Sequence, residues 1–551
     1  MHPPSTSILT ERIDAVLAAR EHREVLTVVS RGQTSAAFTG ASLRAQVNAR
    51  ADQLTAWLGG TGGVVVLAFP PGPLFVTSFL ACLAVGVTAV PVPLPRRGSA
   101  SERLRHIVED CGAAGVLTTD EARPKVRAAL GEDASIPVIA LASGQDPAPC
   151  AAATEGRRAA VIQYTSGSTR WPKGVEITAD NILANCDLVR RTWGFDETSR
   201  FVNWMPHFHD MGLMGGLLYP FLCGATSVQM SPYDFVRRPR AWLEEIAQSR
   251  ATFSGGPAFA FADILARVGR DDLEGLDLTT WSHAYCGGEP VPPGLIEAVR
   301  AHLAPTGLRP EAVFSCYGMA EMTLFAAGRP DPAKDDEAAP ADHGPDHACR
   351  LDDRQLAGIV VVDLVTLTAV CDGDEGEIWL TGPSASAGYV NALDETEAVF
   401  GQRLTGRKET FVRTGDLGRI DGRRLFITGR LKDTLIAHGR KVSAHEVEWL
   451  ACRAEPRLNP LAAAAFMTEE AASGTAALVV ETRGSRTMVA DAQATRRAIR
   501  GAVLGEFGID LVDIVFVPRG RLPRTTSGKT RRRAVAESWR DGAFAPAATV
   551  M

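Results

Sequence analysis

Cysteine is scarce in this chain: ten of its 551 residues are Cys, and no two of them form a C-x-x-C pair. The missing pair argues against a zinc ribbon, and the low count argues against a disulfide framework. The N-terminal residues include Glu11, Arg12 and Asp14, so they lack the uninterrupted apolar region of a signal peptide. We therefore expect a protein of the reducing cytoplasm.

Long apolar runs are missing as well. The stretch 59–94 carries no charge, but prolines at positions 70, 71 and 73 interrupt it. The apolar run 75–90 is shorter than the roughly 20 residues that a membrane-spanning helix requires. Here we predict a buried helix that leads into a strand, and no membrane span.

A surplus of one charge sign is also absent, because 58 Lys and Arg stand against 64 Asp and Glu, a formal net charge of −6. Without a global basic field, a nucleic-acid partner is not expected. Hydrophobic residues form 45% of the chain and charged residues 22%, which excludes a disordered, collagenous or coiled-coil protein. At roughly 150 residues per domain, the length allows several domains, or one large domain with a smaller one.

Short β-branched runs alternate with helical patterns through most of the chain. Residues 64–67 are strand-like, 75–84 helical and 87–92 strand-like again. This alternation predicts layered α/β architecture. The segment 329–354 is polar and broken by prolines, and it is predicted to be a surface insertion.

The segment 164–174, with the sequence Y-T-S-G-S-T-R-W-P-K-G, gathers groups that bind phosphate. Its hydroxyl, Arg and Lys side chains supply donors, and its glycines let the backbone approach closely. It follows the apolar run 159–162 and precedes a helical pattern from Asp180 onward, so we predict a loop between a strand and a helix. It is not a Walker loop, because no G-x-x-x-x-G-K-[ST] occurs. A Ser/Gly-rich linker is the alternative, but linkers seldom end in Pro-Lys-Gly before a helix.

Six motifs in a fixed order give the chain a resemblance to a known superfamily. They are T-S-G-S-T-R-W-P-K-G at 165–174, P-H-F-H-D-M-G-L at 206–213, Y-G-M-A-E-M-T at 317–323, T-G-D-L-G at 414–418, T-G-R-L-K-D at 428–433 and L-P-R-T-T-S-G-K at 522–529. The chain resembles the adenylate-forming superfamily of acyl- and aryl-CoA synthetases, adenylation domains and luciferases. Arg170, where CoA synthetases usually carry Gly, is similar to the fatty acyl-AMP ligase branch.

The resemblance implies an α/β fold with two domains. Residues 1–431 would form a large N-terminal adenylate-forming domain, with two helix-flanked sheets and a small barrel-like subdomain. Residues 432–551 would form a smaller, mobile α+β lid domain, with Lys432 at the hinge. Because the lid carries Lys529, it would bring that lysine into the site for adenylation and remove it for transfer.

The resemblance also implies ATP and Mg²⁺ as cofactors and assigns the site residues. Those expected to bind the nucleotide are Thr165, Ser166, Gly167, Ser168, Thr169, Lys173, Gly288, Tyr317, Gly318, Met319, Asp416 and Arg430. Those expected to act in catalysis are Lys529, His209 and Glu321, and those expected to hold the metal are Glu321 and Thr165.

The residue types suit these roles. Asp416 can accept hydrogen bonds from both ribose hydroxyls, and Arg430 is a permanently charged fork for ribose or phosphate oxygens. Tyr317 would stack on adenine. Lys529 would stabilise the charge that develops as a carboxylate attacks the α-phosphorus.

Two other clusters could hold a metal ion. The H-x-H-D sequence at 207–210 departs from the H-x-H-x-D-H spacing of metal-dependent hydrolases, so a metal site is not favoured there. A second cluster lies in the polar insertion, where an exposed loop is the favoured interpretation. Its members are Asp342, His343, Asp346, His347 and Cys349.

The chain departs from the ligase branch in three places. The insertion 329–354 looks shorter than the ligase-specific insertion thought to exclude CoA. The segment 254–261 carries Ala258 and Phe261 where Asn and Tyr are common, and His207 and Phe208 stand where Pro and Tyr are common. The substitutions at 258 and 261 make this wall less polar, and together with Trp171 and the 207–208 pair they leave the identity of the acid substrate open.

The implied activity is a two-step reaction. A carboxylic acid, most simply a fatty acid, and MgATP would give acyl-AMP and pyrophosphate, and the phosphopantetheine thiol of a holo acyl carrier protein would then take the acyl group. The alternatives are transfer to free CoA, activation of an aryl or amino acid, and a catalytically silent carrier-binding module. The basic strip 519–533, with seven Lys and Arg and no acidic residue, could meet an acidic carrier. The sequence leaves the acid, the carrier and the oligomeric state open.

Overall fold

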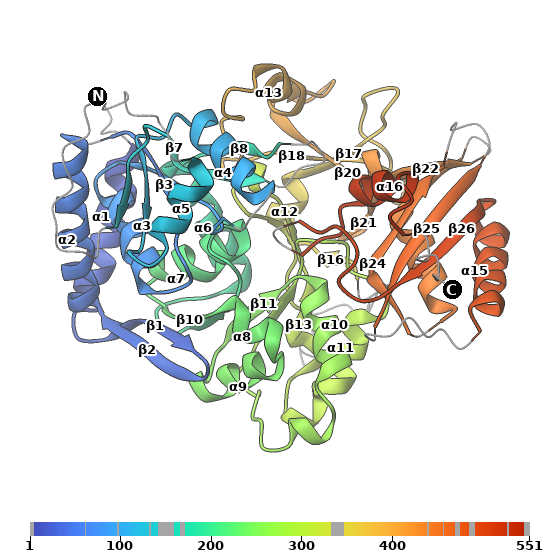
Figure 1. Ribbon diagram of the computed structural model, residues 1–551, viewed down its shortest axis with the longest axis horizontal. Coiled ribbons are helices and arrows are strands. Elements are labelled where there is room, and N and C mark those ends of the chain that lie inside the picture. The colour runs from blue at the N-terminus through green and yellow to red at the C-terminus, as the bar shows by residue number, and fades with distance from the viewer. Residues whose placement is uncertain are drawn as a thin grey trace, which may run out of the picture. The chain divides into compact units, whose positions relative to one another are not determined.

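The computed structural model describes residues 5–60, 62–95, 99–131, 134–140, 159–165, 171–331, 347–437, 440–455, 457–468, 474–483, 491–525 and 528–544. The chain divides into two compact units, and the predicted mixed α/β architecture is confirmed (Figure 1). The first unit comprises residues 1–288, 293–360 and 379–413, and the second comprises 289–292, 361–378 and 414–551. The lid boundary at residue 432 stays a prediction.

The first unit contains a six-stranded sheet that holds both ends of the segment predicted to bind phosphate. Its strands lie in the order β6 (Val138–Ala140), β5 (Gly115–Thr118), β3 (Val64–Leu67), β4 (Thr88–Pro91), β7 (Ala159–Thr165) and β8 (Lys173–Thr178). Neighbours pair in parallel except β7 and β8, which are antiparallel. Every residue of β3 is buried, as expected for a parallel strand covered on both faces.

A seven-stranded sheet completes the frame of this unit. Its order is β13 (Val313–Ser315), β12 (His283–Cys286), β11 (Phe253–Gly256), β9 (Arg200–Asn203), β10 (Thr226–Met230), β1 (Glu24–Ser30) and β2 (Gln33–Thr39). All neighbours pair in parallel except β1 and β2. The longer helices of the unit are α1 (Ser5–Ala19), α2 (Gly40–Leu58), α3 (Pro73–Ala84), α4 (Ser99–Asp110), α5 (Arg123–Leu130), α6 (Ala179–Trp193), α9 (Arg240–Ser249), α10 (Ala258–Arg267) and α11 (Leu295–Leu303).

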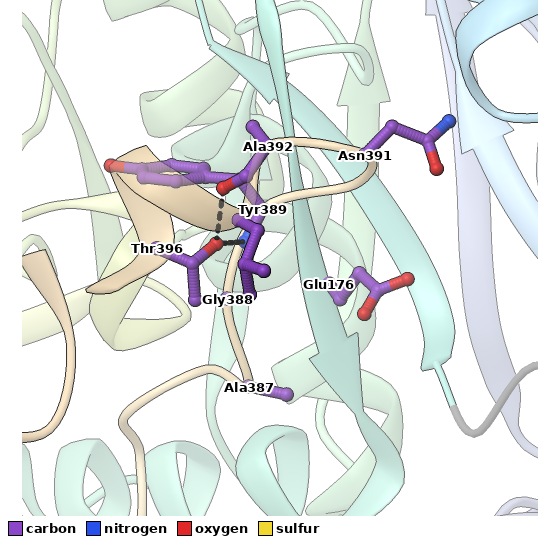
Figure 2. Close-up of a pocket in the computed structure, with 8 residues that line it drawn as sticks. Glu176, Ala387, Gly388, Tyr389, Asn391, Ala392 and Thr396 are labelled. Atoms are coloured by element: carbon purple, nitrogen blue, oxygen red, sulfur yellow. Dashed lines mark hydrogen bonds between the residues drawn. The ribbon is translucent and has the colours of Figure 1, made fainter. Parts of the chain in front are cut away.

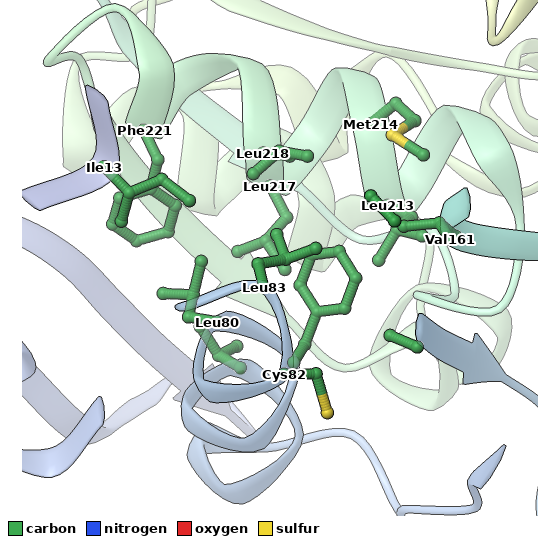
Figure 3. Close-up of a cluster of buried hydrophobic side chains, with 14 of the residues drawn as sticks. Ile13, Leu80, Cys82, Leu83, Val161, Leu213, Met214, Leu217, Leu218 and Phe221 are labelled. Carbon is green, nitrogen blue, oxygen red and sulfur yellow. The ribbon is translucent and has the colours of Figure 1, made fainter. Parts of the chain in front are cut away.

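The largest core joins α3 to a π-helix, Met211–Leu218. Leu80 and Leu83 of α3 belong to this core together with Leu217 and Phe221 (Figure 3). The helix predicted at 75–84 and the strand predicted at 87–92 are confirmed as α3 and β4. Their long apolar run is explained by burial inside a sheet-and-helix core. No helix among the residues described is long and apolar enough to cross a membrane.

The prediction of a loop between a strand and a helix at 164–174 is wrong. The segment connects two strands, because residues 173–178 form β8 and α6 begins only at Ala179. Val175 and Ile177 alternate with more polar residues and are both fully buried, which is a strand pattern of period two. Thr178 then starts the helix with a capping box that it shares with Asn181.

Asn185 on α6 fixes the loop that follows β14 (Tyr317–Gly318). Its amide donates to the carbonyls of Met322 (3.2 Å) and Phe325 (2.8 Å). Its oxygen accepts from the Phe325 amide (3.1 Å) and from the Tyr219 hydroxyl (2.8 Å). The Asn185 side chain is fully buried, so these partners have no water to replace it.

The second unit is built on a three-stranded sheet, β24 (Leu458–Met467), β25 (Thr475–Thr482) and β26 (Asp510–Val517). β24 is antiparallel and β26 parallel to the central β25. Its helices are α14 (Ala444–Arg453), α15 (Ala492–Phe507) and α16 (Arg532–Arg540). The hairpin of β20 (Thr410–Asp421) and β21 (Arg424–Arg430) and the hairpin of β22 (Thr434–Ala437) and β23 (Arg440–Ser443) precede this sheet along the chain.

We expect Asn185→Ala to lower the free energy of unfolding by several kcal/mol, at about 1–3 kcal/mol for each buried partner left without a hydrogen bond. Tyr219→Phe is the matched control, because it removes one of the same hydrogen bonds and should cost only about 1 kcal/mol. Urea unfolding followed by fluorescence measures both. Equal destabilisation by the two variants would contradict the role of Asn185.

Candidate active site

The ends of the phosphate-binding segment are held by the β7–β8 ladder. Thr165 pairs with Lys173, and Tyr164 pairs with Gly174. The Thr165 hydroxyl lies 3.5 Å from the Lys173 carbonyl oxygen, to which it donates. The predicted phosphate-binding residues Ser166, Gly167, Ser168 and Thr169 lie outside the described residues. The structure therefore fixes the strands from which this segment leaves and to which it returns.

Lys173 lies between an acidic and an aromatic partner. Its Nζ is 3.3 Å from Oε1 of Glu395, on α13 (Leu393–Val399), and 5.2 Å from the centroid of the Tyr389 ring. The hydrogen bond from Lys173 holds the pKa of the Glu395 carboxyl below its ordinary value. Both side chains are partly exposed, so a stronger anion can compete for the lysine.

Glu321 is joined to the same cluster through Tyr389. The Tyr389 hydroxyl donates to Oε1 of Glu321 at 2.7 Å. Burial, reinforced by the Glu321 carboxylate, raises the pKa of Tyr389 above its ordinary value, so the phenol remains a donor. Thr165, Lys173 and Glu321, which the sequence assigned to phosphate and metal, thus form one connected group in the first unit.

The backbone around Glu321 is tightly constrained. A Cβ at Gly318 would lie 1.8 Å from the Leu324 carbonyl oxygen, so only glycine fits there. Thr323 has φ +68°, a left-handed conformation that is costly for a β-branched residue. Its hydroxyl donates to the Ser384 carbonyl at 2.8 Å, which helps to hold the strained turn. The Glu321 carbonyl accepts from the Ser386 amide at 2.9 Å.

Met211 connects His209 with the loop that contains Gly288. Nδ1 of His209 is 2.7 Å from Oδ1 of Asp210, and the same oxygen accepts from the Met211 amide at the start of the π-helix. Gly288 has φ +76°, and a Cβ there would lie 2.9 Å from Cε of Met211. A Cβ at the preceding Gly287 would meet the carbonyl of Cys316, the residue before Tyr317. The structure therefore brings the predicted Gly288 loop close to both the His209 and Tyr317 motifs.

His207 is held by contacts with Phe75 and Gln229. Its ring stacks on Phe75 at 4.6 Å, and its Nε2 is 2.7 Å from Oε1 of Gln229. Desolvation lowers the pKa of His207 to about 4, although the hydrogen bond with Gln229 acts in the opposite direction. The ring is therefore neutral near pH 7 and donates to Gln229, which also accepts from Asn203 at 2.8 Å. No cluster of His, Cys, Asp and Glu that could hold a metal occurs in the part of the chain that the structure describes.

Sequence reasoning missed Gln163, Gln229 and Tyr389. Gln163 is buried in β7 and donates to the Phe208 carbonyl at 2.7 Å, which ties the hairpin to the His209 motif. A glutamine between apolar residues of a strand was the available signal. Phe261, which stands where the ligases commonly carry Tyr, is fully buried, with its ring centroid 5.5 Å from that of Trp242. The hydroxyl that it lacks would therefore lie in the protein core.

The insertion cluster is only partly described. Asp342, His343 and Asp346 lie outside the described residues. Cys349 is a buried free thiol, and burial raises its pKa well above the ordinary value. Cys349 is therefore not in the exposed loop that the sequence predicted.

In the second unit, Asp416 and Arg430 pair directly. They are opposite each other in the β20–β21 hairpin, with Nε of Arg430 2.7 Å from Oδ1 of Asp416. The Asp416 side chain is 6% exposed and that of Arg430 is 56% exposed, so the carboxylate depends on this partner more than the guanidinium does. Gly415 has φ +69° and donates to Oε1 of the buried Glu377.

The turn that carries Lys529 is anchored to β25. Thr525 and Lys529 exchange hydrogen bonds through the Thr525 amide and hydroxyl, and Gly528 between them has φ +88°. Arg524 donates to the Gly528 carbonyl at 3.0 Å and to Oε2 of Glu481 at 2.8 Å. Because Glu481 is fully buried, the Lys529 turn is fixed at its base.

The basic strip 519–533 is not uniformly available for docking. Arg524 is bound to Glu481, and Arg532 lies 2.6 Å from Oδ2 of Asp433 and makes a two-bonded pair with Glu448 at 2.9 and 3.0 Å. Arg533, by contrast, is 80% exposed. The strip therefore contains some cations that are held in internal ion pairs and others that are exposed. The exposed members are Arg519, Arg521, Arg531 and Arg533.

Comparison with known proteins identifies the family. The AMP-binding enzyme family matches residues 16–390. A medium-chain-fatty-acid–[acyl-carrier-protein] ligase of Moorena producens is 32% identical over 506 residues, covering 87% of this chain and 86% of that protein. A putative fatty-acid–CoA ligase of Mycobacterium leprae is 32% identical over 514 residues, covering 87% of this chain and 88% of that protein.

A solved structure gives the same result. It comes from structural and functional studies of fatty acyl-adenylate ligases from E. coli and L. pneumophila. It matches with a TM-score of 0.82 at 27% identity, over 97% of this chain and 98% of that one. The chain belongs to the AMP-binding enzyme family, and the predicted resemblance to fatty acyl-AMP ligases is confirmed.

The contribution of His207 and His283 to the free energy of unfolding is expected to fall as the pH decreases from about 6.5 to about 4. Desolvation lowers the pKa of both His207 and His283 to about 4, so the unfolded chain takes up protons in this window that the folded chain does not. His207→Gln should remove up to roughly 3 kcal/mol of this pH dependence. Urea unfolding across this range measures it, with the exposed His22→Gln as control. A His207→Gln slope equal to that of the parent would contradict the assignment.

Arg532→Met should destabilise the second unit by about 3–5 kcal/mol, because it leaves the Asp433 and Glu448 carboxylates without their cation. Arg533→Met is the adjacent matched control and should change stability by no more than about 0.5 kcal/mol. Thermal unfolding distinguishes them. Similar melting temperatures for the two variants would show that the Arg532 cluster contributes little.

Proposed function

We propose that this AMP-binding enzyme activates a fatty acid with ATP to acyl-AMP and pyrophosphate, and then transfers the acyl group to the phosphopantetheine thiol of an acyl carrier protein. The observation that carries the proposal is the cluster of Thr165, Lys173, Tyr389 and Glu321, which joins phosphate-binding donors to a carboxylate. A cytoplasmic setting is part of the proposal, and the free thiols of the cysteines among the described residues agree with it.

In the first step the carboxylate of the acid attacks the α-phosphorus of ATP, and pyrophosphate leaves. Lys173, at the return of the phosphate-binding segment, would exchange Glu395 for the triphosphate. Asp416 would accept from the ribose hydroxyls, and Tyr317 would stack on adenine. Lys529 would stabilise the negative charge that develops around the α-phosphorus, which is where a fixed cation lowers the barrier most.

Glu321 and Thr165 would hold a magnesium ion. Their carboxylate and hydroxyl oxygens are hard donors of the kind that Mg²⁺ prefers, and Tyr389 and the hairpin hold the two side chains on connected parts of the unit. When bound, Mg²⁺ supplies positive charge that neutralises the triphosphate.

The acceptor in the second step is proposed to be a carrier protein. In that step the thiol sulfur attacks the acyl carbonyl carbon and AMP leaves. The Moorena producens relative is named as a carrier-protein ligase, and the matched structure concerns fatty acyl-adenylate ligases. Transfer to free CoA is the second candidate, because the Mycobacterium leprae relative is named as a putative CoA ligase.

Acid-dependent pyrophosphate exchange across fatty, aryl and amino acids tests the first step. We expect exchange with fatty acids, and exchange confined to aryl or amino acids would overturn the proposed substrate class. Acyl-carrier and acyl-CoA formation are then measured side by side with the same acid. Carrier loading should be faster, and CoA loading at an equal or higher rate would overturn the proposed acceptor.

The exposed cations of the basic strip provide the docking test. Reversing Arg531 and Arg533 to Glu, while leaving the internally paired Arg532 in place, should slow carrier loading and reduce its dependence on salt. A rate of carrier loading that changes neither with the charge reversal nor with the salt concentration would show that the strip is not part of the docking site.

Lys529→Ala should reduce adenylation by more than tenfold and leave transfer from a supplied acyl-AMP largely intact. The reason is that the charge is needed only while the α-phosphorus is attacked. Rapid-quench measurement of the separate half-reactions checks this, with the exposed Lys408→Ala as a matched control. An equal loss in both half-reactions would contradict the role given to Lys529.

A further inference from the structure

Tyr389 contacts the proposed metal carboxylate although it lies outside all six motifs. Its hydroxyl donates to Oε1 of Glu321 over 2.7 Å, from a position 68 residues away in the sequence. The side chain is half-buried, and its ring meets Phe400 edge to face at 5.2 Å. A charged acceptor makes this hydrogen bond stronger than one between neutral groups.

The backbone of Tyr389 is fixed on two sides. Its amide donates to the Thr396 hydroxyl at 2.9 Å, and that hydroxyl donates in turn to the Ala392 carbonyl at 2.8 Å (Figure 2). Tyr389 also forms an antiparallel bridge with Val175 of β8. A Cβ on Gly388 would lie 2.6 Å from Cγ2 of Thr396, and the φ of +147° at this position also favours glycine.

The same contacts connect Tyr389 to the phosphate-binding segment. The Val390 amide donates to the Gly174 carbonyl at 2.8 Å, and the Glu176 amide donates to the Gly388 carbonyl at 3.0 Å. Residues 387–390 therefore follow the edge of β8, the strand that begins with Lys173. A surface hollow of about 480 Å³ lies beside this crossing, with Glu176, Asn391 and Thr396 among its lining residues. These residues are drawn in Figure 2. The Tyr389 ring extends away from Glu176 in that view.

We propose that Tyr389 is a positioning residue that orients the Glu321 carboxylate for the metal–nucleotide complex. This inference rests on the proposed function. The hydroxyl holds one carboxylate oxygen at a fixed point on the frame that carries Lys173, so the carboxylate need not be ordered when the nucleotide binds. Pre-ordering of this kind raises affinity without a new contact to the ligand.

The test is Tyr389→Phe, which keeps the ring and its packing on Phe400 and removes only the hydroxyl. Mn²⁺ is the probe, and its binding is followed by electron paramagnetic resonance in the presence of a non-hydrolysable ATP analogue. We expect affinity for Mn²⁺ to fall on the order of tenfold, the effect of losing a charge-assisted hydrogen bond of ~1.4 kcal/mol. Binding of the analogue without metal should change less than about twofold.

Two controls separate positioning from general damage. Tyr233→Phe makes the same chemical change at an exposed tyrosine and should leave Mn²⁺ affinity unchanged. In a Glu321→Ala background, Tyr389→Phe should have no further effect, because the group through which it acts is gone. In turnover, a raised half-saturating Mg²⁺ concentration with an unchanged maximal rate is expected.

Three results would overturn the proposal: unchanged Mn²⁺ affinity, an equal loss of metal-free nucleotide binding, or the same loss with Glu321→Ala present. Failure of the proposed function would look different. In that case the parent enzyme binds Mn²⁺ with the analogue, and Tyr389→Phe weakens that binding as expected. No fatty acid, however, supports pyrophosphate exchange.

Discussion

The predicted phosphate and metal residues of the first unit are positioned by one strand, β8, which is hydrogen-bonded along both edges near its start. One edge pairs with β7, and the other accepts residues 387–390. Gly174 makes this possible, because a Cβ there would lie 2.7 Å from Ile162 and 2.9 Å from the Tyr164 ring. Once the strand is in place, Lys173 at its start and Tyr389 beside it are set at fixed positions. The lysine predicted to bind phosphate and the tyrosine that holds Glu321 are therefore both positioned by β8.

The sequence predicts the parts of this arrangement whose signals are local. The helix α3 and strand β4 are recognisable because their apolar residues are contiguous in the chain. The motif residues Lys173, Glu321 and Lys529 are recognisable because a resemblance carries them position by position. β8 was misread because its six residues begin with Lys and Gly, which suggested a loop, and only Val175 and Ile177 show the period of a strand.

The residues that join the motifs could not be predicted in the same way. Asn185 acts on carbonyls 137 and 140 positions away, and Tyr389 acts on Glu321 across 68 positions. A single asparagine or tyrosine carries no local pattern that reveals such a partner. The π-helix poses the same difficulty, because its Gly216 carbonyl accepts from both Ser227 and Gln229 only after the sheet has formed. These polar contacts are products of the fold and not of any short segment.

Lys173 in the first unit and Asp416 in the second, both predicted to bind the nucleotide, are each paired with an opposite charge, but the two pairs differ in burial. Lys173 and Glu395 are both partly exposed, and such a pair is worth about 0–1 kcal/mol, so a triphosphate can replace the carboxylate at little cost. Asp416 is different, since its side chain is almost fully buried and a buried carboxylate that loses its cation costs several kcal/mol. Neutral ribose hydroxyls cannot supply that charge. Arg430 should therefore remain beside Asp416 if the proposed ribose contact forms, whereas the proposed triphosphate contact would separate Lys173 from Glu395.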